Sequence, residues 1–184
     1  MKIAIIDYNA GNVQSVKFAL QRLGVNGILT GNSEEILSAD KVIFPGVGSA
    51  KTAMEYLKER HLDEVIKSVT QPFLGICLGL QLMCNHTEEG DTKCLGIFDA
   101  GVKLFPPKEK VPHMGWNDLV IDAPHPVFAG IETGDHTYFV HSYHFDVAKP
   151  CERLAHVDYA GDITAVIGRD TMLGMQFHPE KSQH

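Results

Sequence analysis

The stretch PFLGICLGLQLM, residues 72–83, places a cysteine between a strand and a helix. Its apolar run at 73–76 is typical of a buried strand, and apolar residues then recur at helical spacing. Cys77 lies at the junction between Gly75 and Gly79, in the form G-x-nucleophile-x-G of a nucleophile elbow. So sharp a turn strains the backbone at its centre and leaves no room for flanking side chains. The pattern therefore predicts a reactive thiol at a strand end.

The position of Cys77 also suits a nucleophile chemically. Partial positive charge at the start of a helix favours the thiolate form of a cysteine. The backbone N–H of Leu78 is expected to point at the reacting carbonyl and to form half of an oxyanion hole. The alternative is a small buried cysteine that packs at the strand end. The two flanking glycines favour the nucleophile.

A cysteine nucleophile needs a base, and the base needs a group that orients it. The segment FHPE, residues 177–180, supplies both. Pro179 disfavours a helical backbone at His178, and residues two apart in an extended chain project to the same side. His178 and Glu180 are therefore predicted to lie along one edge, with the imidazole facing Cys77. A surface ion pair or a pair of metal ligands are the alternatives.

The loop PGVG, residues 45–48, is the candidate for the second half of the oxyanion hole. Its glycines leave the backbone N–H groups of Val47 and Gly48 free to turn toward the cysteine. One such donor contributes about 2.7–4 kcal/mol to an acyl-transfer reaction, so the loop matters as much as the base. A dinucleotide-binding loop in GVGSAK is a weaker interpretation because the third glycine is missing.

The order of strand-like and helix-like segments predicts an α/β fold with a three-layer arrangement. Continuous apolar strands alternate with helical patterns in the first half, which indicates a mostly parallel sheet flanked by helices, with ligands at the carboxyl ends of its strands. Short strands joined by turns at 158–161 and 169–171 fill the second half and predict antiparallel additions. The stretch 138–147 is predicted to be one strand. A single domain over 1–184 accommodates both halves.

Composition narrows the class of protein. The chain has 184 residues, 44% hydrophobic, and a net charge of −7, which argues against non-specific binding to nucleic acid or anionic membranes. Neither a signal peptide nor a membrane span is predicted. Cys77, Cys84, Cys94 and Cys151 form no C-x-x-C pair, so free thiols in a reducing cytoplasm are expected.

With these motifs in this chain order, the sequence resembles the class I (triad) glutamine amidotransferases. More narrowly, it is similar to the glutaminase subunits of imidazole glycerol phosphate synthases, which act in histidine biosynthesis. Three motifs mark the superfamily: FPGVG at 44–48, GICLGLQLM at 75–83 and QFHPEKSQ at 176–183. Three others point to this subunit: DYNAGN at 7–12 with Ser15, PHMGWN at 112–117 and YFVHSY at 138–143.

The resemblance implies a flavodoxin-like fold and a role for each matching position. Cys77 would attack the side-chain amide of glutamine and form a thioester, with His178 moving the proton and Glu180 orienting it. Backbone N–H groups of Leu78, Val47 and Gly48 would form the oxyanion hole. The amino acid head of the substrate would be held by Gln81 and by backbone groups of Ser142 and Tyr143.

The resemblance also implies a partner and no cofactor. Ammonia would pass to a cyclase subunit with a (β/α)8 barrel fold, in a cytoplasmic heterodimer. Interface or ammonia-exit positions would be Asn12, His113, Trp116, Asn117 and Tyr138, each of which could instead serve local packing. The glycines of PGVG would let the peptide before Val47 rotate, so the oxyanion hole would be complete only when the partner is loaded.

Two features qualify the resemblance. The family usually continues into a C-terminal helix after the last motif, whereas only 184 − 178 = 6 residues follow His178 here. The domain is therefore expected to lack that helix, with weaker support behind His178 and Glu180. In DYNAGN, Asn9 and Ala10 stand where the family often has glycine or another small residue.

Three other functions remain as alternatives. One is a class I glutaminase that serves anthranilate, guanylate, cytidylate or pyridoxal phosphate synthesis; the PHMGWN tract disfavours it. Another is a metal-binding protein that uses His136, His141 and His144. Strand alternation would place His136 and His144 on one face and His141 on the other, which disfavours a shared metal site. The third is an inactive interaction module.

Overall fold

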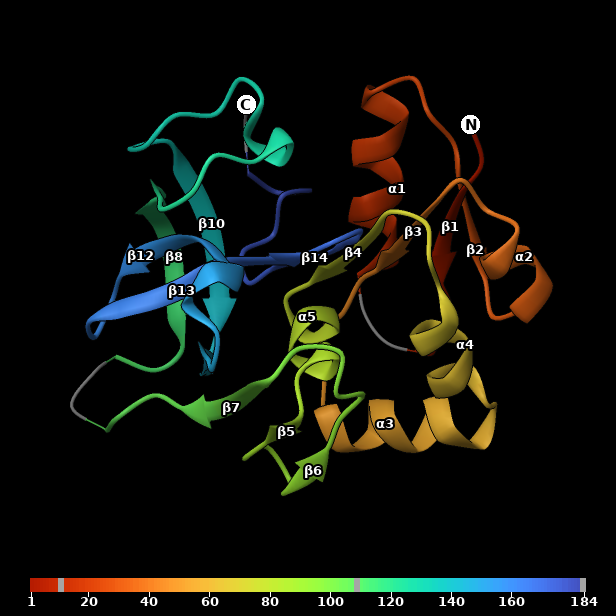
Figure 1. Cartoon of the computed structure of the whole chain (residues 1–184), viewed down its shortest axis with the longest axis horizontal. Coiled ribbons are helices and arrows are strands. Elements are labelled where there is room, and N and C mark those ends of the chain that lie inside the picture. Colours follow the sequence, from red (N-terminus) through yellow and green to blue (C-terminus); the bar gives the residue numbers. More distant parts are fainter. Residues whose placement is uncertain (10–11, 108–109, 183–184) are drawn as a thin grey trace.

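The computed structural model describes residues 1–9, 12–107 and 110–182, and is built on one eight-stranded sheet (Figure 1). Five strands run parallel, and β13, β12 and β9 extend the sheet antiparallel. The order across the sheet is β2 (Gly27–Thr30), β1 (Ile3–Ile6), β3 (Lys41–Phe44), β4 (Phe73–Ile76), β14 (Met172–Met175), β13 (Asp162–Arg169), β12 (Arg153–Asp158) and β9 (Val120–Ile121). The predicted mixed sheet is confirmed.

Helices cover both faces of the parallel half, because successive side chains of a strand point to opposite faces. In β1, Ala4 and Ile6 pack with the cluster that includes α2–α5, whereas Ile3 and Ile5 pack with α1. Figure 1 shows α1 on one side of the sheet and α3, α4 and α5 on the other. The helices are α1 (Val13–Arg22), α2 (Ser33–Leu37), α3 (Ala50–Glu59), α4 (Leu62–Ser68) and α5 (Leu78–Met83), with 3-10 turns η1 (Pro126–Phe128) and η2 (Pro150–Glu152).

Two smaller sheets stand beside the main one. The first pairs β10 (His136–His141) with β8 (His113–Asp118). The second has the order β11 (Tyr143–Val147), β7 (Ala100–Leu104), β5 (His86–Thr87) and β6 (Thr92–Lys93). The prediction of one strand over 138–147 is wrong: the chain breaks at Ser142, and its two parts join different sheets. This break brings both sheets to the carboxyl end of β4.

A close approach between α5 and β3 explains the glycine after the cysteine. A Cβ atom added to Gly79 would lie 2.0 Å from the backbone oxygen of Phe44, at the end of β3. A Cβ atom at Gly75 would lie 2.5 Å from the sulfur of Met83. At Gly79 the clash is with backbone, so the predicted need for glycine there is confirmed. At Gly75 the closest atom belongs to a flexible side chain, and the backbone of Leu80 lies 3.0 Å away, which leaves little room for a side chain. The helix can begin directly after β4 only because these side chains are absent.

No helix in the described part of the chain combines the length and apolar character needed to cross a membrane.

Candidate active site

Cys77 occupies a strained turn between β4 and α5. Its backbone angles are φ 51° and ψ −109°, a combination that residues with a side chain rarely adopt. Its N–H donates to the carbonyl of Met175 on the neighbouring strand, at 2.8 Å, which ties the turn to the sheet. The predicted elbow geometry is therefore present, and the side chain lies at the carboxyl edge.

His178 and Glu180 form a buried pair. The Nδ1 atom of His178 lies 2.7 Å from Oε1 of Glu180, and the two side chains are 2% and 5% exposed. The expected pairing is present, but the expected extended backbone is wrong. Residues 179–181 form a turn in which the N–H groups of Lys181 and Ser182 donate to the carbonyl of His178, at 3.0 and 2.9 Å. The turn, rather than strand alternation, brings the two side chains together.

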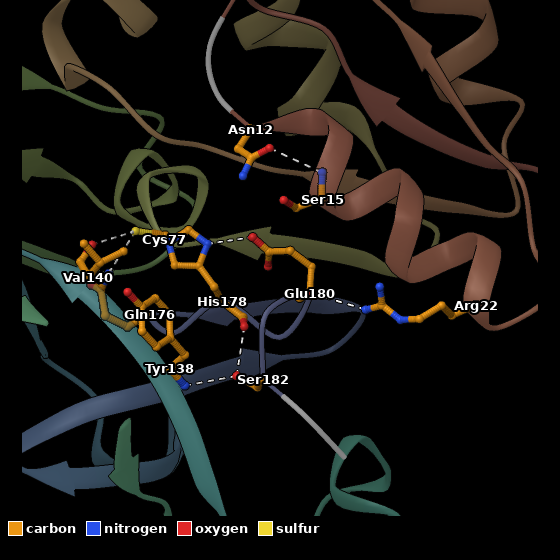
Figure 2. Close-up of polar contacts among 10 residues, drawn as sticks. All are labelled: Asn12, Ser15, Arg22, Cys77, Tyr138, Val140, Gln176, His178, Glu180 and Ser182. Carbon is orange, nitrogen blue, oxygen red and sulfur yellow. Dashed lines mark hydrogen bonds and ion pairs between the residues drawn. The ribbon is translucent and has the colours of Figure 1, made fainter. Parts of the chain in front are cut away.

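The segment that carries this pair is fastened to two neighbours (Figure 2). The N–H of His178 donates to the carbonyl of Tyr138 on β10, at 2.9 Å. The hydroxyl of Ser182 accepts from the N–H of Tyr138 at 3.0 Å and donates to the carbonyl of His178 at 2.9 Å. On the other side, Arg22 of α1 donates to the carbonyl of Glu180, at 3.4 Å. These contacts fix the imidazole in place from both sides.

The other ring nitrogen of His178 is turned toward Cys77 (Figure 2). Nε2 is buried and makes no hydrogen bond to any of the described residues in this structure. Burial lowers the pKa of His178, but the neighbouring Cys77 and the hydrogen-bonded Glu180 outweigh burial and raise the pKa to about 9. With this pKa the ring carries a proton at neutral pH.

A cavity of about 320 Å³ opens beside the sulfur. It collects most of the positions expected to meet the substrate, although the chain contributes them from three separate regions. They are Val47, Gly48, Cys77, Leu78, Gln81, Ser142 and Tyr143. The volume suits one small molecule with a reacting group placed against Cys77.

Sequence reasoning missed Glu89, which also lines this cavity. It lies between β5 and β6, and its Oε2 accepts from the N–H of Ala50 at the start of α3, at 3.1 Å. That contact leaves a carboxylate at the cavity wall, where it can bind a cationic group. No motif surrounds Glu89 in the sequence, and only the packing of α3 against the β5–β6 turn brings it here.

The oxyanion hole is not open in this structure. The N–H of Leu78 donates to the carbonyl of Gly46, at 3.4 Å. In a planar trans peptide the C=O and N–H groups point in opposite directions, so the N–H of Val47 points away from Leu78. One donor is therefore occupied and the other is turned outward.

Two buried histidines beside the cavity are neutral. Nδ1 of His141 lies 2.7 Å from the carbonyl of Tyr143, and its Nε2 lies 3.0 Å from Nδ1 of His113. Because a carbonyl only accepts, His141 donates through Nδ1 and accepts from His113 through Nε2. Burial lowers the pKa of His113 to about 4 and that of His141 to about 3. His141 therefore holds the carbonyl of Tyr143, and His113 holds His141 in turn, without adding charge.

The expected faces of the histidines in β10 and β11 are corrected by the break at Ser142. His141 and His144 both pack on Phe105, with ring centroids 5.3 and 4.9 Å apart from it. His136 instead pairs with Asp118 in an exposed contact of 3.0 Å. Within residues 1–9, 12–107 and 110–182, no three His, Cys, Asp or Glu side chains cluster as metal ligands would.

An exposed apolar surface lies on β8 and β10, next to the cysteine. Trp116 is 51% exposed and contacts the ring of Tyr138 edge-on, with centroids 5.6 Å apart. Met114 is 62% exposed and pairs across the two strands with Val140. The carbonyl of Val140 lies 3.9 Å from the Cys77 sulfur. The surface is therefore one strand away from the nucleophile.

The other positions expected at an interface have local contacts. Asn12 caps α1 by accepting from the N–H of Ser15 at 3.3 Å (Figure 2). Asn117 donates to the carbonyl of Asp158 at 3.2 Å. His113 is only 4% exposed, because it is stacked between Tyr159 and Phe139. Of the expected interface positions, the structure thus places His113 in the interior. Residues 10–11, where Ala10 of the DYNAGN motif falls, lie outside the described residues.

Comparisons with known proteins agree with this geometry. The family model "Glutamine amidotransferase class-I" matches residues 4–184. The curated "Imidazole glycerol phosphate synthase subunit HisH" of Bacteroides fragilis is 50% identical over 185 residues, which cover 99% of this chain and 93% of that protein. The protein of the same name from Cereibacter sphaeroides is 47% identical, covering 100% and 93%.

Solved structures share the fold at low sequence identity. One described as "glutamine amidotransferase" has a TM-score of 0.77 at 20% identity, covering 97% of this chain and 90% of that one. A glutamine amidotransferase from Thermotoga maritima has a TM-score of 0.68 at 17% identity, covering 98% and 76%. At this identity the likeness concerns the fold alone.

The buried pair of His178 and Glu180 should stabilise the fold in a pH-dependent way. Folding raises the pKa of His178 from an ordinary 6.5 to about 9. A raised pKa stabilises the folded state fully below the unfolded value, and the effect is lost as the pH rises through the folded value. The free energy of unfolding of the wild type should therefore exceed that of Glu180→Gln most near pH 6 and least above pH 9.

Denaturant unfolding of both proteins across this range measures the difference. Glu64→Gln is the control, since Glu64 forms an exposed pair with Lys67. A difference between wild type and Glu180→Gln that stays constant with pH would contradict the assignment of a protonated His178.

Proposed function

The chain belongs to the class-I glutamine amidotransferase family, and we propose that it is the glutaminase subunit of an imidazole glycerol phosphate synthase. In this role it hydrolyses glutamine to glutamate and ammonia. The observation that carries the proposal is the position of Cys77 beside a protonated His178 that is oriented by Glu180, at the wall of a small cavity. The full-length relatives that bear the subunit's name support the same function.

The geometry supports a two-step reaction. The sulfur of Cys77 attacks the side-chain amide carbon of glutamine, and His178 gives its Nε2 proton to the leaving nitrogen, which departs as ammonia. The thioester that remains is attacked by water, whose proton returns to Nε2 as glutamate leaves. Glu180 keeps Nδ1 protonated and stabilises the imidazolium in both steps. No cofactor takes part in these steps.

Recognition of the amino acid head falls to the opposite wall of the cavity. Both N–H bonds of the Gln81 amide group are taken, by the carbonyl of Tyr143 and by Gln176. Gln81 can therefore offer only its oxygen, which accepts from an ammonium group. The carboxylate of Glu89 adds the opposite charge, and backbone groups of Ser142 and Tyr143 remain for the carboxylate of the substrate. These groups would bind a free amino acid, which has both an ammonium and a carboxylate group, in preference to a simple amide, which has neither.

The partner we propose is a cyclase subunit with a (β/α)8 barrel fold, in a heterodimer that delivers ammonia for histidine biosynthesis. Met114 and Trp116 form an exposed apolar surface beside Tyr138, and Val140 connects that surface to the sulfur. Docking of the partner there would put the ammonia exit one strand away from the thioester. We assign Asn12 and Asn117 to the edge of this proposed interface.

The proposed function also agrees with a single domain and a cytoplasmic location. A single domain over residues 1–184 fits the match of the family model over 4–184. All four cysteines are free thiols, which supports a reducing cytoplasm as the working compartment.

Hydrolysis of glutamine should depend on Cys77, and the ammonia that it releases should reach the partner. In the complex with the cyclase, Cys77→Ala should lower glutamine-dependent product formation by at least ~10³-fold, because covalent catalysis is lost. Product formation from added ammonium salt should stay near the wild-type rate, since the cyclase site is intact. The assay measures formation of the imidazole product.

Cys151→Ser serves as the control, because Cys151 is an exposed thiol outside the cavity. Full glutamine-dependent activity in Cys77→Ala would refute the nucleophile. If the wild-type chain supported glutamine-dependent product formation only with a different synthase, the proposed partner would be refuted.

The closed oxyanion hole predicts that the partner controls the rate. Rotation of the peptide between Gly46 and Val47 would free the N–H of Leu78 and add that of Val47. Because one oxyanion donor changes the rate by about 10²–10³-fold, hydrolysis by the lone subunit should be slower than by the loaded complex by at least that factor. Steady-state glutamate release measures both rates.

Alkylation of Cys77 by a small amide reagent provides the reference, since it needs no oxyanion hole and should differ little between the two states. Equal rates of glutamine hydrolysis by the loaded complex and by the isolated chain would exclude this rotation as a switch.

A further inference from the structure

Gln176 is a buried side chain that connects the substrate cavity to the nucleophile. It follows β14, is fully buried, and its N–H donates to the carbonyl of Ala165 at 2.9 Å. Its amide oxygen accepts from Nε2 of Gln81 at 3.0 Å, and its amide nitrogen lies 3.7 Å from the sulfur of Cys77. Figure 2 shows Gln176 beside Cys77, on the side of the sulfur away from Glu180. The residue therefore belongs to the site but to neither the triad nor the cavity wall.

The polarity of this chain of hydrogen bonds is fixed by the backbone. The carbonyl of Tyr143 can only accept, so the group of Gln81 that faces it, at 3.2 Å, is the NH₂ group. That same NH₂ group faces Gln176, which must therefore present its oxygen. The NH₂ group of Gln176 is then left for Cys77. Turning either amide around would place two donors or two acceptors against each other.

A donor at this position favours a negative charge on sulfur, because a hydrogen bond to the charged form stabilises that form. The other close backbone group is the carbonyl of Val140, at 3.9 Å, which accepts from a thiol and opposes a thiolate. Gln176 thus approaches the sulfur as a donor, and Val140 approaches it as an acceptor. The balance between thiol and thiolate depends on which of these contacts is kept.

We propose that Gln176 is a positioning residue that presents an N–H donor to the Cys77 sulfur and links it to the side chain that meets the substrate. The first half of this statement concerns the thiol alone. The second half rests on the proposed function, because it assigns Gln81 to the amino acid head of glutamine. A substrate that pulls on the oxygen of Gln81 polarises both amides and strengthens the donor at the sulfur.

Other ionisable groups near the sulfur stay unchanged when Gln176 is replaced. These groups come from four parts of the fold. His178 and Glu180 belong to the segment after β14, and Tyr8 lies at the end of β1. His141 belongs to β10, and Glu89 lies in the β5–β6 turn. Burial keeps Tyr8 and His141 neutral, since it raises the pKa of the first and lowers that of the second. A change in the pH dependence of Cys77 can therefore be traced to the amide.

The test is the rate of alkylation of Cys77 by iodoacetamide as a function of pH, read by peptide mass spectrometry in the full chain. Gln176→Met keeps the length of the side chain and removes the donor. The midpoint of the rate profile should move up by about one pH unit, so that labelling falls about 10-fold on the acid side of the wild-type midpoint. Gln176→Glu places an acceptor at the sulfur and should slow labelling further.

Gln81→Met leaves Gln176 in place but frees its amide to turn, so it should shift the labelling profile in the same direction by a smaller amount. The double variant Gln81→Met/Gln176→Met should then shift it no further than Gln176→Met alone. Gln71→Met is the matched control, because the amide of Gln71 donates to the carbonyl of Ile36 at the opposite end of β4. It should leave the profile and glutamine hydrolysis unchanged.

Unchanged labelling profiles in Gln176→Met and Gln81→Met, with native circular dichroism, would overturn the proposal. Labelling needs no glutamine, so this result is independent of whether the chain hydrolyses glutamine. In the hydrolysis assay, Gln176→Met should lower kcat by about 10-fold with a smaller change in KM. An increase in KM with kcat unchanged would instead assign Gln176 to substrate binding.

Discussion

The site depends on the backbone of Cys77 being held in a conformation that it would not adopt alone. That conformation persists because β4 delivers the chain to the edge of the sheet and α5 begins at once, packed against the end of β3. The absence of a side chain at Gly79 permits the contact with Phe44, and the hydrogen bond from Cys77 to Met175 ties the turn to β14. The same strand leads into Gln176 and His178. The strained turn therefore sets the position of the nucleophile and of the groups that meet it.

Three buried histidines near the cavity show how surroundings assign different roles to one residue type. His178 is charged because a carboxylate and a thiol face its two nitrogens. His141 meets a backbone carbonyl and a second histidine instead, and burial keeps it neutral. Neighbouring titratable groups whose pKa values are shifted in opposite directions by their environments are typical of acid–base sites. Here the charged ring has the state that the proposed proton transfer needs, and the neutral ring of His141 supports the backbone around Tyr143.

Local patterns made the parallel half of the fold and the elbow at Cys77 predictable from the sequence, because the apolar run before Cys77 and its two glycines lie within a few residues of each other. The pairing of His178 with Glu180 was also predicted, but a turn brings the two side chains together, not the extended chain on which that prediction was based. Features that depend on pairing between distant segments were not predictable. At Ser142 one apolar stretch is divided between two sheets. Because the sequence does not show this break, the prediction of the faces on which His136, His141 and His144 lie was wrong. The burial of His113, the position of Glu89 and the amide chain through Gln176 likewise arise only when three or more segments pack together.

The charge state of His178 tests the central claim most directly. Titration of its ring signals by NMR in the resting protein measures this state, with His178→Gln to assign them among the ten histidines. A midpoint at about 9 in the wild type is expected, because Cys77 and Glu180 outweigh the effect of burial. In Cys77→Ala the midpoint should fall, since one of the two partners is removed. A midpoint near the ordinary value of about 6.5 in both proteins would contradict the protonated His178, held between Cys77 and Glu180, on which the account rests.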